Sequence, residues 1–363
     1  MLITWVYLLV KDKLLVWWRH RGSKAAKRCP RSGTWRVGKG DVKQGVAIVT
    51  GASSGLGLAT TRELAKEGFH VVLACRSVGS GEKAAASIRA SFPKASLQVS
   101  VLDLCLYKSI LAFADSVEAL VGNGTEHGPL RLLVNNAGVF TLTQRWTDDR
   151  IDRMIASNYL GHFILTNRLL PLLQKAAPNA RVVNVGSWTH RAANFVPVRR
   201  QLLASGFDGA FRLGGPQFYT PAYSYQASKL CIIAHALALH KRCYQEAKES
   251  RRVSVNVADP GFIYSALLRE VPGWLHVPAV WIYAILRLMH PARVGAQTVL
   301  DAALADPTVS GQYFFGGQGR TLEPSKVLAS TGIVEDVWRE SCAIQTDLRL
   351  QHGGPHIAVP GAS

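Results

Sequence analysis

The sequence predicts an α/β protein in which one doubly wound parallel β-sheet of about seven strands is covered by helices on both faces. Two observations predict this class: short, almost uninterrupted apolar runs alternate with helical segments, and a glycine-rich turn follows the first run. The 363 residues allow one such domain of about 250–300 residues with extensions. A hydrophobic fraction of 48% is ample for its core, and a charged fraction of 18% argues against disorder.

The expected elements alternate along the chain. The apolar runs predict strands at 46–49, 70–74, 97–102, 132–134, 182–185, 253–257 and 311–315. The helical patterns occupy 58–67, 82–91, 110–121, 149–175 and 223–246. Right-handed crossovers bring the carboxyl ends of parallel strands to one edge, so we expect the ligand site at that edge, as in a Rossmann-type domain.

The rest of the chain divides into extensions. An apolar segment at 1–18 is expected to be a membrane-associating helix, followed by a basic linker at 19–44. The α/β domain is expected over 45–320, with a lid-like insertion at 194–220. A helical extension at 321–350 and a flexible tail rich in Gly and Pro at 351–363 complete the chain.

Positive charge is concentrated at the amino end. Residues 1–44 contain eleven Lys or Arg and two Asp, a net charge of +9 out of +18 for the chain. A basic segment beside apolar residues fits an anionic membrane surface, with the α/β domain on the cytosolic side of the endoplasmic reticulum or another organelle. An apolar helix packed on the domain's own surface is the alternative. No zinc-finger, RNA-binding or basic-zipper pattern accompanies the charge, so nucleic acid is not an expected partner.

The six cysteines form no C-x-x-C pair and do not cluster with histidines. Neither a metal site nor a disulfide scaffold is therefore expected, and a reducing compartment is favoured.

A glycine-rich turn, Thr50-Gly-Ala-Ser-Ser-Gly-Leu-Gly57, follows the first strand directly. Glycines let the chain turn tightly and let backbone amides approach a pyrophosphate, which then lies at the amino end of the next helix. The spacing is G-x-x-x-G-x-G rather than the more usual G-x-G-x-x-G. The expected contacts with a dinucleotide are Gly51, Ser53, Ser54, Gly55, Leu56 and Gly57.

The end of the second strand indicates which dinucleotide binds. NAD sites usually place an acidic residue there for the ribose 2′-hydroxyl, whereas this chain has Arg76, whose guanidinium suits a 2′-phosphate. NADP(H) is therefore the expected cofactor. The other expected contacts along this edge follow the third and fourth strands and are Asp103, Leu104, Asn136, Ala137 and Gly138.

Tyr225 and Lys229 are the pair on which the functional prediction depends. Four residues apart on a helix, they share one face. A phenol with a pKa near 10 needs a neighbouring ammonium to lower that pKa before it can exchange protons at neutral pH. Ser187, after the fifth strand, can donate a hydrogen bond to a substrate oxygen. Asn158 is expected to hold a water that relays protons to Lys229.

Taken together, these motifs resemble the short-chain dehydrogenase/reductase family over residues 44–320. The resemblance implies a single Rossmann-type domain with a nicotinamide cofactor. It also implies a catalytic tetrad at Asn158, Ser187, Tyr225 and Lys229. The family further implies that Tyr225, Lys229, Pro260 and Gly261 contact the cofactor, with Lys229 on the nicotinamide ribose.

Two stretches, 74–77 and 158–163, are similar to the retinol dehydrogenase and protochlorophyllide reductase branch of that family. The later stretches 224–230, 269–272 and 314–317 look closer to plant relatives of the chromosome-X dehydrogenase/reductase. Two positions depart from the family pattern. Gly186 replaces a common serine, and 38 positions separate Ser187 from Tyr225, where many members have roughly a dozen.

The additional segments indicate the substrate. The insertion at 194–220 is expected to be a lid, and the apolar stretch 274–289 to wall a pocket, dock on lipid or form a core helix. We therefore expect a lipophilic alcohol and its aldehyde or ketone (retinoid, polyprenoid or steroid-like), reached from a membrane by a monomer or a homodimer. Two alternatives stay open: a non-catalytic, membrane-bound NADP(H) sensor or scaffold, and a protochlorophyllide-type reductase.

Overall fold

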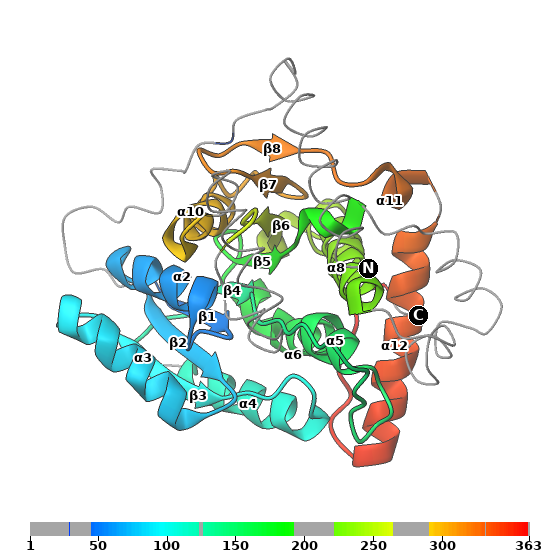
Figure 1. The fold of residues 1–363 in the computed structure, drawn as a ribbon, viewed down its shortest axis with the longest axis horizontal. Coiled ribbons are helices and arrows are strands. Elements are labelled where there is room, and N and C mark those ends of the chain that lie inside the picture. Colours follow the sequence, from blue (N-terminus) through cyan, green and yellow to red (C-terminus); the bar gives the residue numbers. More distant parts are fainter. Residues whose placement is uncertain are drawn as a thin grey trace.

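The computed structural model describes residues 29, 45–122, 126–191, 221–263, 290–330 and 332–361 (Figure 1). One eight-stranded sheet, in the order β3-β2-β1-β4-β5-β6-β7-β8, organises these residues. The strands are β1 (Val46–Thr50), β2 (His70–Cys75), β3 (Leu97–Val101), β4 (Leu130–Asn135), β5 (Arg181–Val185), β6 (Ser254–Asp259), β7 (Tyr313–Phe315) and β8 (Thr321–Leu322). The predicted α/β class with a mostly parallel sheet is confirmed.

The strands pair in parallel from β3 to β7, and only β8 runs antiparallel to its neighbour. Every residue of β1, β2, β5 and β6 is buried, which explains why apolar residues predominate in them, although β5 also buries Arg181 and Asn184. The sequence does not predict β8, because a strand of two residues is too short to show an apolar pattern.

Helices cover both faces of the sheet (Figure 1). One face carries α2 (Gly55–Lys66), α3 (Val78–Ser91) and α10 (Ala292–Ala303), whose apolar side chains form one core cluster with the sheet. The other face carries α4 (Tyr107–Leu120), α6 (Gly161–Lys175) and α8 (Pro221–His240). These helices form the second core cluster.

The helix predicted over 149–175 is divided in the structure. A short helix, α5 (Arg153–Ile155), starts after Asp152, whose Oδ1 accepts hydrogen bonds from the amides of Met154 and Ile155 at 2.9 and 3.1 Å. A π-helical turn, η2 (Ala156–Leu160), separates it from α6. Apolar periodicity alone does not reveal such a turn, which frequently marks a functional site.

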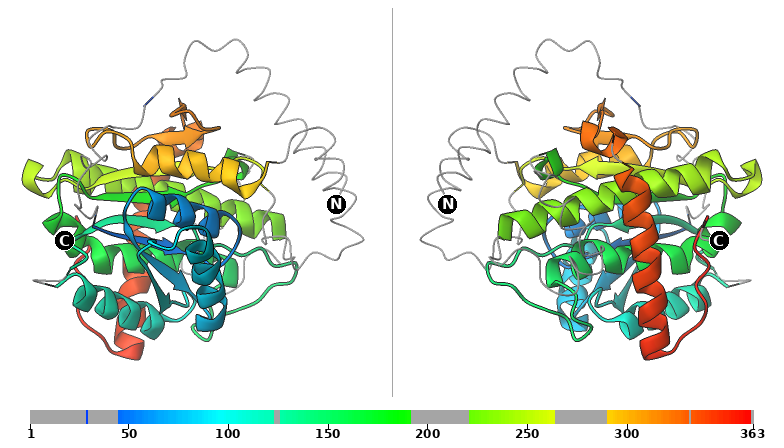
Figure 2. Two further views of the ribbon diagram at one scale, coloured as in Figure 1. Left: turned by 90° about the vertical axis from the view of Figure 1, so that its left-hand side faces the viewer. Right: turned by 90° about the vertical axis from the view of Figure 1, so that its right-hand side faces the viewer.

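The carboxyl-terminal part packs onto the second face. After α11 (Lys326–Ser330), helix α12 (Ile333–His352) lies across α8, in red in the right-hand view of Figure 2. Tyr159 and Ser341 join η2 to α12 through their hydroxyls, 2.5 Å apart. The sequence predicts a flexible tail after this helix, whereas Ile357 is only 6% exposed and belongs to the core.

Several predicted segments lie outside the described residues: the apolar helix at 1–18, nearly all of the linker at 19–44, the insertion at 194–220 and the stretch 274–289. Within the described ranges, no helix combines the length and the apolar character that crossing a bilayer requires.

Candidate active site

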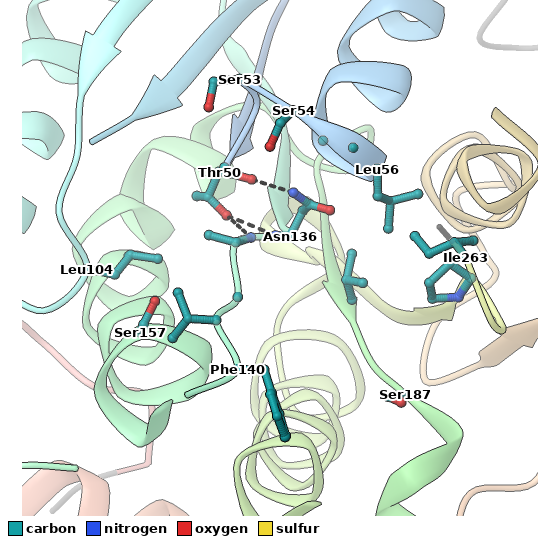
Figure 3. A pocket seen from close by; sticks show the side chains of 18 of the residues that line it. Thr50, Ser53, Ser54, Leu56, Leu104, Asn136, Phe140, Ser157, Ser187 and Ile263 are labelled. Carbon is teal, nitrogen blue, oxygen red and sulfur yellow. Dashed lines mark hydrogen bonds between the residues drawn. The ribbon is translucent and has the colours of Figure 1, made fainter. Parts of the chain in front are cut away.

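A cavity of about 740 Å³ opens where the parallel strands end (Figure 3). All the residues predicted to bind a cofactor line it, as does Ser187, although they come from distant parts of the sequence. These cofactor-site residues are Gly51, Ser53, Ser54, Gly55, Leu56, Gly57, Arg76, Asp103, Leu104, Asn136, Ala137, Gly138, Tyr225, Lys229, Pro260 and Gly261. Asn158 is the one predicted site residue that does not line the cavity.

The glycine-rich turn leads from β1 into the amino end of α2. Gly51 and Gly55 have φ values of +67° and +53°, which favour glycine. A Cβ on Gly57 would lie 2.3 Å from the carbonyl oxygen of Gly51, so the two backbone segments approach too closely for a side chain. The side chain of Ser54 does not cap α2, and the first turn of the helix has no acidic residue. The helix amino end at the cavity is therefore suited to an anion.

Thr50 links the glycine-rich turn to the loop after β4 (Figure 3). Its Oγ1 accepts hydrogen bonds from the amides of Asn136 and Ala137, both at 2.9 Å. The side-chain amide of Asn136 donates to the Thr50 carbonyl oxygen at 2.7 Å. Sequence reasoning gave Thr50 no such role, because its partners lie more than eighty residues further along the chain.

His162 in α6 continues this network. Its Nε2 lies 2.9 Å from Thr50 Oγ1, and its Nδ1 lies 3.4 Å from the carbonyl oxygen of Asn158. Because the lone pairs of Thr50 Oγ1 serve two amides, we infer that the hydroxyl donates to Nε2. Burial lowers the pKa of His162 to about 3, so the ring is neutral, as this arrangement requires.

The far end of the cavity has the character of an adenosine-phosphate site. Arg76 is exposed directly after β2, and no acidic residue stands between it and the start of α3. Ser77 and Ser80 also line this end, with Ser80 Oγ donating to the Ser77 carbonyl oxygen at 3.0 Å. Sequence reasoning missed both serines, although Ser77 at the start of a helix after Arg76 was an available signal. Asp103 accepts the Cys105 amide at 2.9 Å, which fixes the loop after β3.

At the other end, Tyr225, Lys229 and Ser187 come together. Lys229 Nζ donates to the Val185 carbonyl oxygen at 2.9 Å and lies 5.8 Å from the centre of the Tyr225 ring. Ser187 lies close enough to Tyr225 for its hydroxyl to lower the pKa of the phenol. Thr189 Oγ1 donates to Ser187 Oγ at 3.0 Å and orients it. The arrangement can hold a substrate oxygen between a serine and a tyrosine hydroxyl.

The electrostatics of this pair differ from the sequence prediction. Burial raises the pKa of Tyr225, and the nearby carboxylate of Asp259 raises it further, against a lowering by the hydrogen bond with Ser187. Burial also lowers the pKa of Lys229 to about 8, opposed by Asp259. In the protein alone, the pKa of Tyr225 is therefore raised rather than lowered, because burial removes the water that would stabilise a phenolate.

Asn158 lies in the π-helical turn η2 and is buried. Its Oδ1 accepts the Val139 amide at 2.7 Å, and its Nδ2 donates to the Val139 carbonyl oxygen at 3.0 Å and to Ser228 Oγ at 3.1 Å. The side chain ties the loop after β4 to α8. The side chain is engaged with protein groups and Asn158 does not line the cavity, so its expected role in holding a water stays a prediction.

The wall beside Tyr225 is apolar. The Phe140 ring meets the Tyr225 ring edge-on, with centres 5.8 Å apart, and Met154 packs behind both. Val139, Trp188 and Ile263 also line the cavity. Sequence reasoning assigned none of these residues, because their common location depends on the folding of three separate loops.

Comparisons with known proteins agree with this geometry. A family model described as short chain dehydrogenase matches residues 45–197. Bovine retinol dehydrogenase 12 (Bos taurus) is 33% identical over 305 residues, covering 82% of this chain and 85% of the relative. Mouse polyprenol dehydrogenase (Mus musculus) is 36% identical over 275 residues, covering 74% of each chain.

Solved structures are similar as well. An uncharacterised protein from Mycobacterium paratuberculosis superposes with a TM-score of 0.60 at 27% identity, over 84% of this chain and 94% of that one. A variant actinorhodin polyketide ketoreductase with NADPH gives a TM-score of 0.54 at 22% identity, over 76% and 97% of the two chains. The second likeness shows the fold alone.

Proposed function

Because the chain belongs to the short-chain dehydrogenase family, we propose that it is an NADP(H)-dependent oxidoreductase that interconverts a lipophilic alcohol and its aldehyde or ketone. The observation that carries this proposal is the meeting of Tyr225, Ser187 and Lys229 at an apolar end of the cavity that the glycine-rich turn enters. A protein that only bound the cofactor would have no need of two hydroxyls aimed at one oxygen.

The lining residues fit NADP(H). The amino end of α2 and the glycine-rich turn would hold the pyrophosphate, and Arg76 would pair with the 2′-phosphate, assisted by Ser77 and Ser80. The absence of an acid directly after β2 in the described sequence supports NADP(H) over NAD(H). When bound, the cofactor supplies or accepts the hydride.

The proton is handled by residues of the chain. In reduction, Ser187 and Tyr225 would donate hydrogen bonds to the carbonyl oxygen, and Tyr225 would pass its proton to that oxygen as the hydride reaches the carbon. In oxidation the same proton returns from the alcohol to the phenolate. Lys229 would hold the nicotinamide ribose and place its charge beside the phenol. Asn158 would support the site by holding Val139 and Ser228 in place.

Three features support a lipophilic substrate. Phe140, Trp188 and Ile263 give the cavity an apolar wall. The matched relatives include proteins named retinol dehydrogenase and polyprenol dehydrogenase. The apolar and basic amino end would seat the domain on a cytosolic membrane surface, such as that of the endoplasmic reticulum, from which the lipid is drawn.

The proposal is tested with the full-length chain, NADPH or NADH, and a panel of retinal, polyprenal and steroid carbonyls, following the loss of reduced-nicotinamide absorbance. We expect turnover with NADPH. Tyr225→Phe removes the proton donor and should lower kcat by at least about 10²-fold while NADPH still binds. Tyr223→Phe is the matched control, because Tyr223 lies on the same helix but does not line the cavity. Equal activity of Tyr225→Phe and the native chain would remove the catalytic assignment.

A further inference from the structure

Asp259 is the last residue of β6 and has no role in the function proposed above. It is 1% exposed, yet it lines the cavity at the end that holds Tyr225. Its Oδ1 accepts the Gly261 amide at 2.9 Å, and its Oδ2 accepts the hydroxyl of Tyr313 at 2.5 Å. The sequence motif indicated only Pro260 and Gly261 as functional.

These two bonds favour the ionised form of Asp259. A separation of 2.5 Å between a hydroxyl and a carboxyl oxygen is typical of an O–H···O⁻ hydrogen bond. The amide of Gly261 donates to the other oxygen, so each oxygen of the carboxylate has a donor. Burial raises the pKa of Asp259 above its ordinary value, whereas these two hydrogen bonds and the charges of Arg191 and Lys229 lower it.

The topology places Lys229 next to this carboxylate. Lys229 Nζ donates to the Val185 carbonyl oxygen at the end of β5. Val185 pairs in register with Ala258 of β6, so the ammonium lies beside the strand end that carries Asp259. Among the described residues that line the cavity, only Asp103 and Asp259 carry carboxylates, and Asp103 belongs to the adenosine end.

We propose that Asp259 is a positioning residue that acts through its charge. Its carboxylate keeps Lys229 as an ammonium and Tyr225 as a neutral phenol. At neutral pH Tyr225 can then donate its proton to a carbonyl oxygen, which favours the reductive direction. This inference rests on the proposed function.

A negative charge stabilises the protonated form of both neighbours, because protonation makes a lysine positive and a phenol neutral. Asp259 accordingly raises the pKa of Tyr225, in addition to burial, and raises the pKa of Lys229 against the lowering by burial. Removal of the charge should lower both pKa values together. A residue that only shaped the Pro260 turn would leave both unchanged.

Other charged and titratable groups also face Asp259. Tyr313 comes from β7, and Arg191, which is exposed, lies over the Tyr313 ring at 5.7 Å. His190 is 5.4 Å from the same ring, and burial lowers its pKa to about 4, so it is neutral near pH 7. Arg191 is the remaining cation, and it would be retained in a variant that changes Asp259 alone.

The test variant is Asp259→Asn, which keeps the shape of the side chain. Its amide oxygen can still accept from Gly261 and its amide nitrogen can donate to Tyr313. The matched control is Asp301→Asn. Asp301 is also a buried aspartate and accepts a hydrogen bond from the Gly319 amide at 2.9 Å, but it does not line the cavity.

The measurement is the pH dependence of kcat for carbonyl reduction and for alcohol oxidation. In Asp259→Asn the pH at which kcat for reduction falls and kcat for oxidation rises should move down by about one unit or more. At a fixed pH where kcat depends on pH, this shift changes kcat about tenfold. Asp301→Asn should keep the native profile. An unshifted profile in a folded, active Asp259→Asn overturns the inference while leaving the proposed function intact.

A second readout needs no substrate. The pKa of Lys229 is about 8 in the folded protein against an ordinary value of 10.5, so the unfolded chain binds more protons between these values. The contribution of Lys229 to the free energy of unfolding should therefore rise with pH across that window. Buried thiols such as Cys105 and Cys243, whose pKa values burial raises from 9.0 to about 12, contribute in the opposite sense above pH 9 in every variant, so the comparison is the difference between each variant and the native chain. In Asp259→Asn the rise should begin clearly below pH 8, and in Asp301→Asn at the native pH. If no carbonyl compound is reduced, the proposed function fails, and an onset that stays at the native pH in Asp259→Asn would contradict the role of Asp259 independently.

Discussion

At the scale of single residues, the proposed function divides the cavity between two tasks. Arg76 and the glycine-rich turn lie at the end suited to a phosphorylated adenosine, and Tyr225, Ser187 and Lys229 lie at the end suited to proton transfer. Hydrogen bonds of Thr50 tie the glycine-rich turn to the loop after β4, which lies more than eighty residues further along the chain. A substitution at one end should therefore change cofactor binding and chemistry to different extents.

Arg76 provides the clearest test of the cofactor end. Arg76→Ala removes the guanidinium expected to pair with the 2′-phosphate, so the Kd for NADPH should rise about 10- to 100-fold and that for NADH should change little. Lys83→Ala, an exposed cation on α3, is the matched control. Fluorescence titration with each cofactor gives both constants. An equal loss of affinity for NADPH and NADH would show that Arg76 does not recognise the 2′-phosphate.

Individual site residues were predictable to different degrees. Gly51, Arg76 and Tyr225 could be found because each motif is local, within a few residues of a recognisable strand or helix. His162 could not be found in this way, because its partner Thr50 is brought close by the fold.

At the scale of secondary-structure elements, α12 closes the second face of the domain. Trp338 is 3% exposed, its ring centre lies 5.3 Å from that of Phe163, and the Arg242 guanidinium lies over it at 4.5 Å. Ser341 and Gln345 add polar bonds to Tyr159 and Asn167. Because Tyr159 lies in the π-helical turn that carries Asn158, α12 supports the site from behind.

Trp338→Ala should therefore destabilise the domain by about 3–5 kcal/mol, since it leaves a large cavity between α12 and α8. Denaturant unfolding measures the change. Trp146→Ala is the control, because Trp146 is 40% exposed and its loss should cost less than about 1 kcal/mol. If Trp338→Ala also lowers the free energy of unfolding by less than about 1 kcal/mol, α12 does not stabilise the fold in the way that its packing indicates.

The strands were predictable because burial on both faces leaves them mainly apolar, as in β1. The π-helical turn at 156–160 was not, because its apolar residues fit the periodicity of an uninterrupted helix. The position of Ile357 in the core was hidden for a different reason: a single apolar residue in a Gly- and Pro-rich stretch shows no pattern.

At the scale of the whole molecule, the parallel sheet gathers residues from Gly51 to Gly261 along one edge. This convergence follows from the topology and could be predicted from the order of strands and helices. The pKa values of the groups that line the cavity could not be predicted from the sequence, because they depend on how deeply each group is buried. Thus the sequence predicted that Lys229 lowers the pKa of Tyr225, whereas in the structure burial and Asp259 raise it.

The central claim is that a hydride passes directly between NADP(H) and a carbonyl carbon at the Tyr225 end of the cavity. It is tested most directly by supplying NADPH deuterated at the transferring position and analysing the alcohol by mass spectrometry. The account predicts one deuterium on the carbinol carbon in the native chain and no labelled alcohol with Tyr225→Phe. An alcohol product without deuterium, or labelled product formed equally by the variant, would contradict it.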